Sequence, residues 1–162
     1  MNTTSMIDDV GKGREGELIF KEDFLNFLGI EYVDVTGCQK FQAIDTDFKS
    51  TIGLYEIKNT YKDNRQVVIE EFTNINPDLC PISKGWFYKT KSDLVVFVSY
   101  KTRVMVLVPF TVEFKAHYES IKENYRLCRN SVTTKGANRW QSAIRFIPLD
   151  DIKGYYSMYK KL

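Results

Sequence analysis

Two nearly continuous apolar runs constrain the fold of this chain more than any other feature. They are "LVVFVSY", residues 94–100, and "VMVLVPF", residues 104–110, and only the polar segment "KTR" separates them. Strands with one wet face alternate apolar and polar residues, whereas strands covered on both faces read as unbroken apolar runs. We therefore expect two central strands of a sheet that is packed on both faces.

Further elements are predicted on both sides of this pair. Apolar spacing predicts helices over residues 13–29 and 112–128, the first ending at Gly29. Alternation predicts strands over 31–36, 41–48, 53–59, 65–72 and 142–149, of which the first four form a meander. Residues 73–93 and 129–141 read as loops, and 150–162 as a terminal helix. This order predicts an α/β fold with a mixed central β-sheet flanked by helices.

Length and composition indicate a single folded domain over residues 1–162. The apolar share of 43% and the aromatic share of 14% are those of a chain with a hydrophobic core. No stretch approaches the apolar length of a membrane span, and the N-terminus lacks the pattern of a signal peptide. We therefore expect a soluble, cytoplasmic protein, in the host cytoplasm if a phage encodes it, with no membrane partner.

The histidine and cysteine counts disfavour several kinds of site. His117 is the only histidine, so zinc sites rich in histidine and mechanisms that need a catalytic histidine would all depend on this one residue. Cys38, Cys80 and Cys128 are odd in number and far apart, which predicts neither a disulfide framework nor a metal knuckle.

Charge is segregated along the chain. Residues 1–100 hold 11 basic and 16 acidic side chains, whereas residues 101–162 hold 12 and 5. This distribution is expected if the first part gathers divalent cations and the second lies along a polyanion. Solvated helix faces would produce the same count.

The segment "DTDFKSTIGLYEIK", residues 45–58, carries more charge than strands usually do. Residues two apart in a strand face the same way, so we expect Asp45 and Asp47 to share a face, and Glu56 and Lys58 likewise. If a hairpin brings Asp47 and Glu56 together, their repulsion is costly unless a divalent cation neutralises it. Hard oxygen ligands with open positions suit Mg²⁺, and such a site could hydrolyse phosphodiester bonds.

The bare pattern acid-x-Lys is weak by itself, because it occurs four times. The copy at Glu56 and Lys58 differs from the others in lying within an apolar strand, with another acid delivered nine residues upstream. A structural alternative stays open, in which Glu56 and Lys58 form a solvent-facing pair worth about a few tenths of a kcal/mol.

These residues resemble the PD-(D/E)XK nuclease superfamily, whose core is a helix followed by a β-meander with Asp on the second strand and Glu-x-Lys on the third. The resemblance covers about residues 14–98, and "GREGE" is similar to the lead-in helix of the Holliday-junction resolvase branch. It implies a restriction-endonuclease-like core in which Asp47, Glu56 and Lys58 take the motif positions. Thr46 stands where the motif has Pro, which leaves Asp45 as the alternative motif aspartate.

The resemblance also implies a mechanism. Asp47, Glu56 and the backbone carbonyl of Ile57 would hold Mg²⁺, or Mn²⁺ in its place, with Glu17 or Glu70 on the outer or second-metal side. Lys58 would orient or deprotonate the attacking water and offset charge on the phosphate. Glu17 is open to a structural interpretation as an acid favoured at a helix start, and Glu70 as a charge at a sheet edge.

Two basic segments are candidates for contact with DNA. Lys89 and Lys91 follow three aromatic residues, a pattern that suits a nucleic-acid backbone. The favoured alternative is that Trp86 and Tyr88 cover the core while Lys89 and Lys91 stay solvated. Arg129, Lys135 and Arg139 belong to the most basic local cluster of the chain, together with Arg126 and Arg145. Such a cluster suits phosphate contacts that do not read sequence.

The sequence therefore predicts an endodeoxyribonuclease for branched DNA, such as a Holliday junction, in recombination or repair. The resolvase resemblance extends to a homodimer. One alternative is a sequence-specific restriction-type endonuclease, which the lack of a base-reading module disfavours. The other is a non-catalytic DNA-binding protein with a nuclease fold, which the retained carboxylates disfavour.

Overall fold

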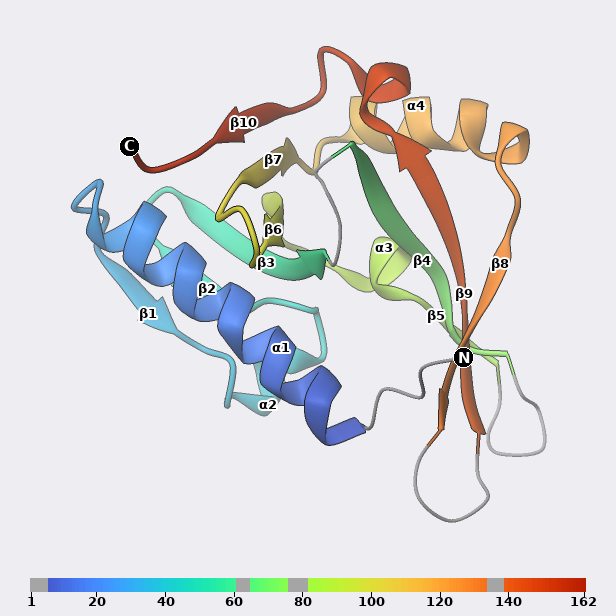
Figure 1. Ribbon diagram of the computed structural model, residues 1–162, viewed down its shortest axis with the longest axis horizontal. Helices are drawn as coiled ribbons and strands as arrows, with labels where there is room; N and C mark the ends of the chain where they lie inside the picture. The colour runs from blue at the N-terminus through green and yellow to red at the C-terminus, as the bar shows by residue number, and fades with distance from the viewer. Residues whose placement is uncertain (1–5, 61–64, 76–81, 134–138) are drawn as a thin grey trace.

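The fold consists of two β-sheets with helices around them (Figure 1). The computed structural model describes residues 6–60, 65–75, 82–133 and 139–162, and the side chains of 13–60, 65–75, 82–129 and 141–162. The central sheet has the order β1 (Tyr32–Asp34), β2 (Phe48–Ser50), β3 (Gly53–Thr60), β6 (Leu94–Ser99), β7 (Met105–Pro109) and β10 (Ser157–Tyr159). The second sheet has the order β5 (Ser83–Lys84), β4 (Gln66–Asn74), β9 (Arg139–Pro148) and β8 (Cys128–Thr133). Because β3 and β6 run parallel while the other paired strands are antiparallel, the central sheet is mixed, as predicted.

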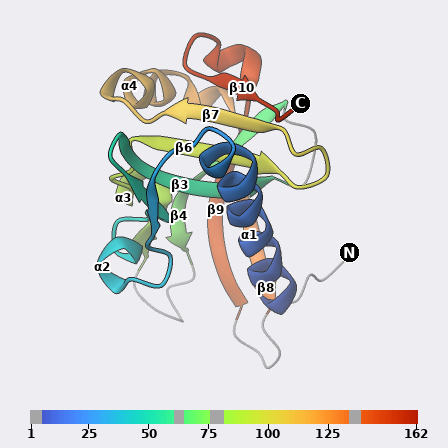
Figure 2. The same ribbon diagram turned by 90° about the vertical axis from the view of Figure 1, so that its left-hand side faces the viewer.

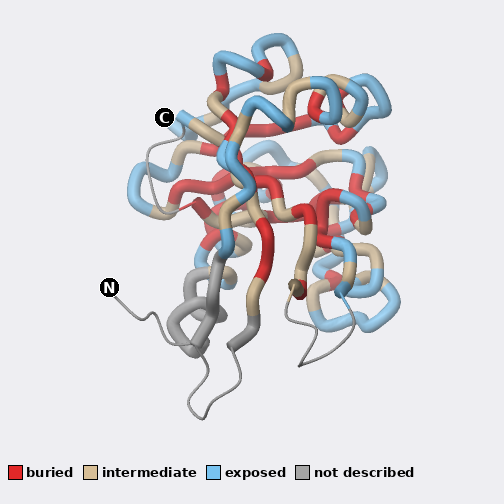
Figure 3. The backbone as a smooth tube through the Cα atoms, turned by 90° about the vertical axis from the view of Figure 1, so that its right-hand side faces the viewer, coloured by how far each residue is buried: buried red, intermediate tan, exposed pale blue. Residues whose placement is uncertain are grey.

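Strands β6 and β7 are central and covered on both faces, which confirms the prediction from the two apolar runs. Val95 and Phe97 of β6 join one core cluster, and Val96 and Val98 join the other. All four side chains are at most 2% exposed. The burial extends along both strands in Figure 3, so the two apolar runs form the layer between the two cores.

The N-terminal helix covers one face of the central sheet (Figure 2). Helix α1 (Met6–Phe20) continues as a π-helical segment (Lys21–Asn26), and the chain reverses at Gly29, whose φ of +66° suits glycine. Ile19 and Phe20 pack with Tyr55 and Ile57 of β3. The predicted helix is thus confirmed, and it begins earlier than residue 13.

The second sheet, α3 (Trp86–Lys89) and α4 (Val112–Ile121) cover the other face. Val67 and Ile69 of β4 pack there with Trp86 and Tyr118. Strand β4 was predicted as the fourth strand of a meander, and this is wrong, because β4 pairs with β5 and β9 instead. The chain therefore leaves the central sheet after β3 and returns to it at β6, parallel to β3.

The predicted strand over residues 41–48 is also wrong. Residues Gln39–Gln42 form the short helix α2, and a turn follows in which the Thr46 N–H donates to the Phe41 carbonyl. Asp45 lies in this turn with a φ of +45°, a conformation that Asp tolerates better than most residues. Because these local bonds occupy the backbone groups, pairing begins only at Phe48.

Two further predictions fail in the C-terminal part. Much of the predicted loop over 129–141 is strand, because β8 and β9 pair as a ribbon whose connection, 134–138, lies outside the described residues. The predicted terminal helix is a 3-10 turn, Leu149–Ile152, followed by edge strand β10. Gly154, with a φ of +93°, separates the two. Among the described residues, no helix has the length and apolar character needed to cross a membrane.

Candidate active site

Asp47 lies one residue before β2, at the edge of β3. Its N–H donates to the carbonyl of Tyr55 at 2.8 Å, and Tyr55 is also the register partner of Phe48. Its Oδ2 atom accepts a hydrogen bond from the Ile57 N–H at 2.8 Å. Since the N–H and C=O of one strand residue point to the same side, the Ile57 carbonyl also leaves β3 toward Asp47.

Glu56 and Lys58 share the opposite face of β3 from Ile57. The Lys58 ammonium contacts Glu56 Oε1 in an ion pair, and the side chains are 5% exposed for Glu56 and 27% for Lys58. The second oxygen, Glu56 Oε2, is buried and has no hydrogen-bond partner among the described residues. A buried carboxylate oxygen of this kind is costly unless a proton or a cation satisfies it.

The carboxylates of Asp47 and Glu56 form a coupled pair. Burial raises the pKa of Asp47 to about 6, although the hydrogen bond from Ile57 opposes this. Burial also raises the pKa of Glu56 to about 7, against the opposing effect of Lys58, and the charge of Asp47 adds a smaller increase. Without a cation, the fold therefore resists placing both negative charges here at once.

Lys58 remains a cation in this environment. Burial alone would lower its pKa, but the contact with Glu56 and the charges of Asp45 and Asp47 outweigh burial and raise the pKa. The ammonium also lies 5.3 Å from the centre of the Trp86 ring. The sequence had assigned Trp86 to the core, and nothing in its spacing indicated this contact with Lys58.

Two further predicted acids, on other elements, lie within reach of the Lys58 charge. Glu17 extends from α1, and its pKa is raised by burial and by the charges of Asp34 and Glu56, while Lys58 opposes the increase. Glu70 belongs to the second sheet, where it accepts hydrogen bonds from the Trp86 N–H and the Ser142 side chain, and burial raises its pKa against the effect of Lys58.

Asp47, Glu56, Lys58 and Glu17 are called the carboxylate site below. Among the described residues, no group of three or more His, Cys, Asp and Glu side chains is arranged to hold a metal ion together. A divalent ion here would therefore be held by Asp47, Glu56 and the Ile57 carbonyl, and its other ligands would be water or substrate oxygens. The direct metal role predicted for Glu70 stays a prediction.

Asp45 and Asp47 do not share a strand face, because Asp45 lies in the turn. The Asp45 carboxylate forms an ion pair with Lys89, with 3.2 Å between Oδ2 and Nζ. Its carbonyl accepts hydrogen bonds from the side chains of Thr90 and Ser92, at 2.9 and 3.1 Å. The two carboxylates therefore have different partners, since Asp47 accepts a hydrogen bond from β3 and Asp45 pairs with Lys89.

The residues predicted to contact DNA fall into different surroundings. Lys89 pairs with Asp45, whereas Lys91 and Arg129 are exposed. Lys135 lies outside the described residues, and Arg139 is described only as a backbone position in β9. Their contact with DNA stays a prediction.

Arg145 does not belong to a solvent-exposed basic cluster. It is 6% exposed, and its Nε atom lies 2.9 Å from Glu71 Oε1, while Tyr118 donates to the same oxygen at 2.6 Å. Nothing in the sequence indicates this burial, because Glu71 lies far from Arg145 along the chain.

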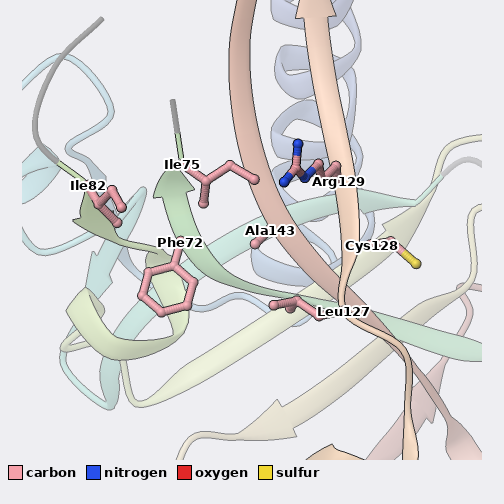
Figure 4. A pocket seen from close by; sticks show the side chains of 7 residues that line it. All are labelled: Phe72, Ile75, Ile82, Leu127, Cys128, Arg129 and Ala143. Atoms are coloured by element: carbon pink, nitrogen blue, oxygen red, sulfur yellow. The ribbon is translucent and has the colours of Figure 1, made fainter. Parts of the chain in front are cut away.

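An apolar pocket of about 330 Å³ lies elsewhere on the second sheet (Figure 4). Phe72, Leu127 and Ala143 contribute to its apolar lining, and Arg129 stands at its wall. Ala143 follows Ser142 in β9, so the pocket opens on the opposite face of that strand from the Ser142 side chain. None of its lining residues belongs to the carboxylate site.

Comparison of the chain with models of protein families, with curated proteins and with solved structures found no match.

Proposed function

We propose that this protein is a metal-dependent endodeoxyribonuclease of the PD-(D/E)XK type that cuts branched or structured DNA. The observation that carries the proposal is the pairing of a half-buried carboxylate, Asp47, with a buried one, Glu56, and the contact of Lys58 with Glu56. Two acids that repel each other inside a fold are a cost to stability, which a site for a cation would explain.

The residues present fit a hard divalent cation. Glu56 Oε2 is a buried acceptor without a partner among the described residues, and the Asp47 carboxylate is fixed through one oxygen by the Ile57 N–H. Carboxylate and carbonyl oxygens are the ligands that Mg²⁺ prefers, and Mg²⁺ keeps several positions for water and phosphate oxygens. When bound, Mg²⁺ would supply Lewis-acid activation of the phosphodiester and of a water molecule.

Lys58 is suited to an electrostatic role. Its raised pKa keeps the side chain as an ammonium, which can orient an attacking water and offset charge that develops on the phosphate. The contact with Glu56 and the nearby Trp86 ring hold the ammonium in place, so it needs little reorganisation during the reaction. Glu17 borders the same space from α1 and is a candidate for the outer side of the metal.

The arrangement of elements also supports the proposal. Helix α1 is followed by the antiparallel strands β1, β2 and β3, with Asp47 directly before β2 and Glu56 and Lys58 on β3. This is the order of helix, meander, Asp and Glu-x-Lys by which the sequence resembles the superfamily. The departure is small, since Asp47 precedes its strand rather than lying within it.

A cleavage assay with a matched pair of lysine variants tests the proposal. Four-way, flap and linear duplex DNA are incubated with the protein in Mg²⁺, in Mn²⁺ and in EDTA. We expect cleavage with either metal and none in EDTA, and a loss of about 10²-fold or more in Lys58→Ala. The control is Lys49→Ala, which removes the exposed lysine of Asp47-x-Lys49. Absence of cleavage of every substrate by the wild-type protein would refute the proposal.

A further inference from the structure

Helix α1 and strand β3 meet at a point where only glycine fits. A Cβ atom on Gly16 would lie 2.1 Å from Asn59 Oδ1 and 2.8 Å from Asn59 Cγ, closer than real side chains approach one another. Gly13, one turn earlier in the same helix, offers a contrast, because a Cβ atom there would meet nothing within 4 Å. The glycine at position 16 therefore sets how closely α1 approaches β3.

The contact between Gly16 and Asn59 destabilises the fold. Glycine in a helix interior is less stable than alanine there. In addition, Asn59 Oδ1 and Nδ2 are both buried without a hydrogen-bond partner among the described residues, and a buried polar group of this kind is destabilising. An alanine on the helix over a small apolar residue on the strand would fill the same space without either cost. Stability alone does not explain this pair.

The two residues of this contact adjoin the carboxylate site. Asn59 follows Lys58 in β3 and points to the opposite face, toward α1. Gly16 precedes Glu17, whose carboxylate senses the charges of Glu56 and Lys58. The separation between α1 and β3 at Gly16 and Asn59 therefore determines how near Glu17 comes to the other charged groups.

We propose that Asn59, seated in the space left by Gly16, is a positioning residue that holds α1 at the distance at which Glu17 joins Glu56 and Lys58. This inference rests on the proposed nuclease function, since it concerns the geometry of the same site. As a positioning residue, Asn59 itself contacts neither DNA nor metal. It acts through the backbone of α1.

The first test compares alanine at the two glycines. In Gly16→Ala either the Asn59 side chain or α1 must shift, and in both cases Asn59 no longer holds α1 at its present distance from β3. A misplacement of about 1 Å can cost about 10²-fold in rate. We expect Mg²⁺-dependent cleavage of the best wild-type substrate to fall by about this factor. Gly13→Ala should keep the wild-type rate and raise the melting temperature, because it improves helix propensity without a clash. Equal rates for the two folded variants would overturn the inference.

A double-mutant cycle separates positioning from a general effect on the fold. If Gly16 acts through Glu17, Gly16→Ala should have little further effect in a Glu17→Gln background. Full additivity of the two losses in rate would contradict the inference. The double variant Gly16→Ala/Asn59→Ala gives the new Cβ atom room, so we expect it to recover much of the lost rate.

Asn59→Ala keeps the test decisive if Gly16→Ala does not fold. It should lower the cleavage rate without lowering the melting temperature, because it loosens α1 while removing an unsatisfied amide. If Asn59 had only a structural role, its substitution would lower both the cleavage rate and the melting temperature, or neither of them. Either result would overturn the inference. If the wild-type protein cleaves no DNA, the proposed function fails first, which is a different outcome from cleavage that these variants leave unchanged.

Discussion

The carboxylate of Asp47 accepts a hydrogen bond from the backbone N–H of Ile57, two positions beyond the Asp47 partner Tyr55 on β3. Strand β2 begins only at Phe48, so at this register the side chain takes the place that a backbone carbonyl would fill in a longer strand. The bond fixes one carboxylate oxygen beside β3, so the hairpin of β2 and β3 determines where the Asp47 carboxylate lies.

Neutral variants of the paired acids should stabilise the metal-free protein at high pH. The pKa values of Asp47 and Glu56 are raised, so their contribution to stability is present below their ordinary values of 3.8 and 4.5 and is lost as pH rises through about 6 and 7. At pH 8 in EDTA, Asp47→Asn should therefore be more stable than the wild type by about 1–3 kcal/mol. The difference should shrink toward pH 4, as measured by thermal unfolding at each pH.

The corresponding glutamate variant, Glu56→Gln, should behave in the same way, and both should lose Mg²⁺-dependent cleavage. Asparagine at position 47 retains an oxygen for the Ile57 N–H, so a structural loss is not expected. A wild-type protein that is more stable than both variants at pH 8 in EDTA would show that no repulsion is stored in the pair.

Substitution of Asp45 should have much less effect on cleavage than substitution of Asp47. Asp45 is paired with Lys89 and lies in a turn, whereas the Asp47 carboxylate accepts a hydrogen bond from Ile57 of β3. We expect Asp45→Asn to retain a rate within about tenfold of the wild type, whereas Asp47→Asn loses about 10²-fold or more. The reverse order of the two rates would assign the motif aspartate to Asp45.

The two arginines Arg145 and Arg129 should separate stability from DNA binding. Arg145→Ala leaves Glu71 buried without its ion pair, so urea unfolding should show a loss of about 3–5 kcal/mol. Arg129→Ala, at an exposed site, should leave stability unchanged. If Arg129 contacts a phosphate, its removal should reduce the slope of log K against log salt by about one unit. An unchanged slope would remove Arg129 from the DNA interface.

The parts of the fold that follow from one local pattern were predictable from the sequence. The runs over 94–100 and 104–110 have no polar face, and apolar and polar residues alternate around Glu56. Strands β6, β7 and β3 therefore lie where expected. The strand with which another strand pairs was not predictable in this way. Strand β4 reads like a continuation of the hairpin, and only its packing against α4 and pairing with β9 place it in a second sheet.

The shared strand face of Glu56 and Lys58 was predictable, but the surroundings of Asp45 were not. Alternation placed Glu56 and Lys58 on one face, whereas the positive φ of Asp45 and the turn around it depend on hydrogen bonds to Thr90 and Ser92 from far along the chain. The burial of Arg145 depends likewise on Glu71 and Tyr118. Contacts between segments that are far apart along the chain produce no periodic pattern of residue types in the sequence.

We propose that Asp47 and Glu56 together hold one divalent cation. Calorimetric titration with Mn²⁺ at pH 8 measures this binding. We expect the wild-type protein to bind one Mn²⁺ at this site, and Asp47→Asn and Glu56→Gln each to weaken this binding by about 10²-fold, with Lys49→Ala unchanged. Mn²⁺ binding that is absent in the wild type, or equally strong in both carboxylate variants, would contradict the claim.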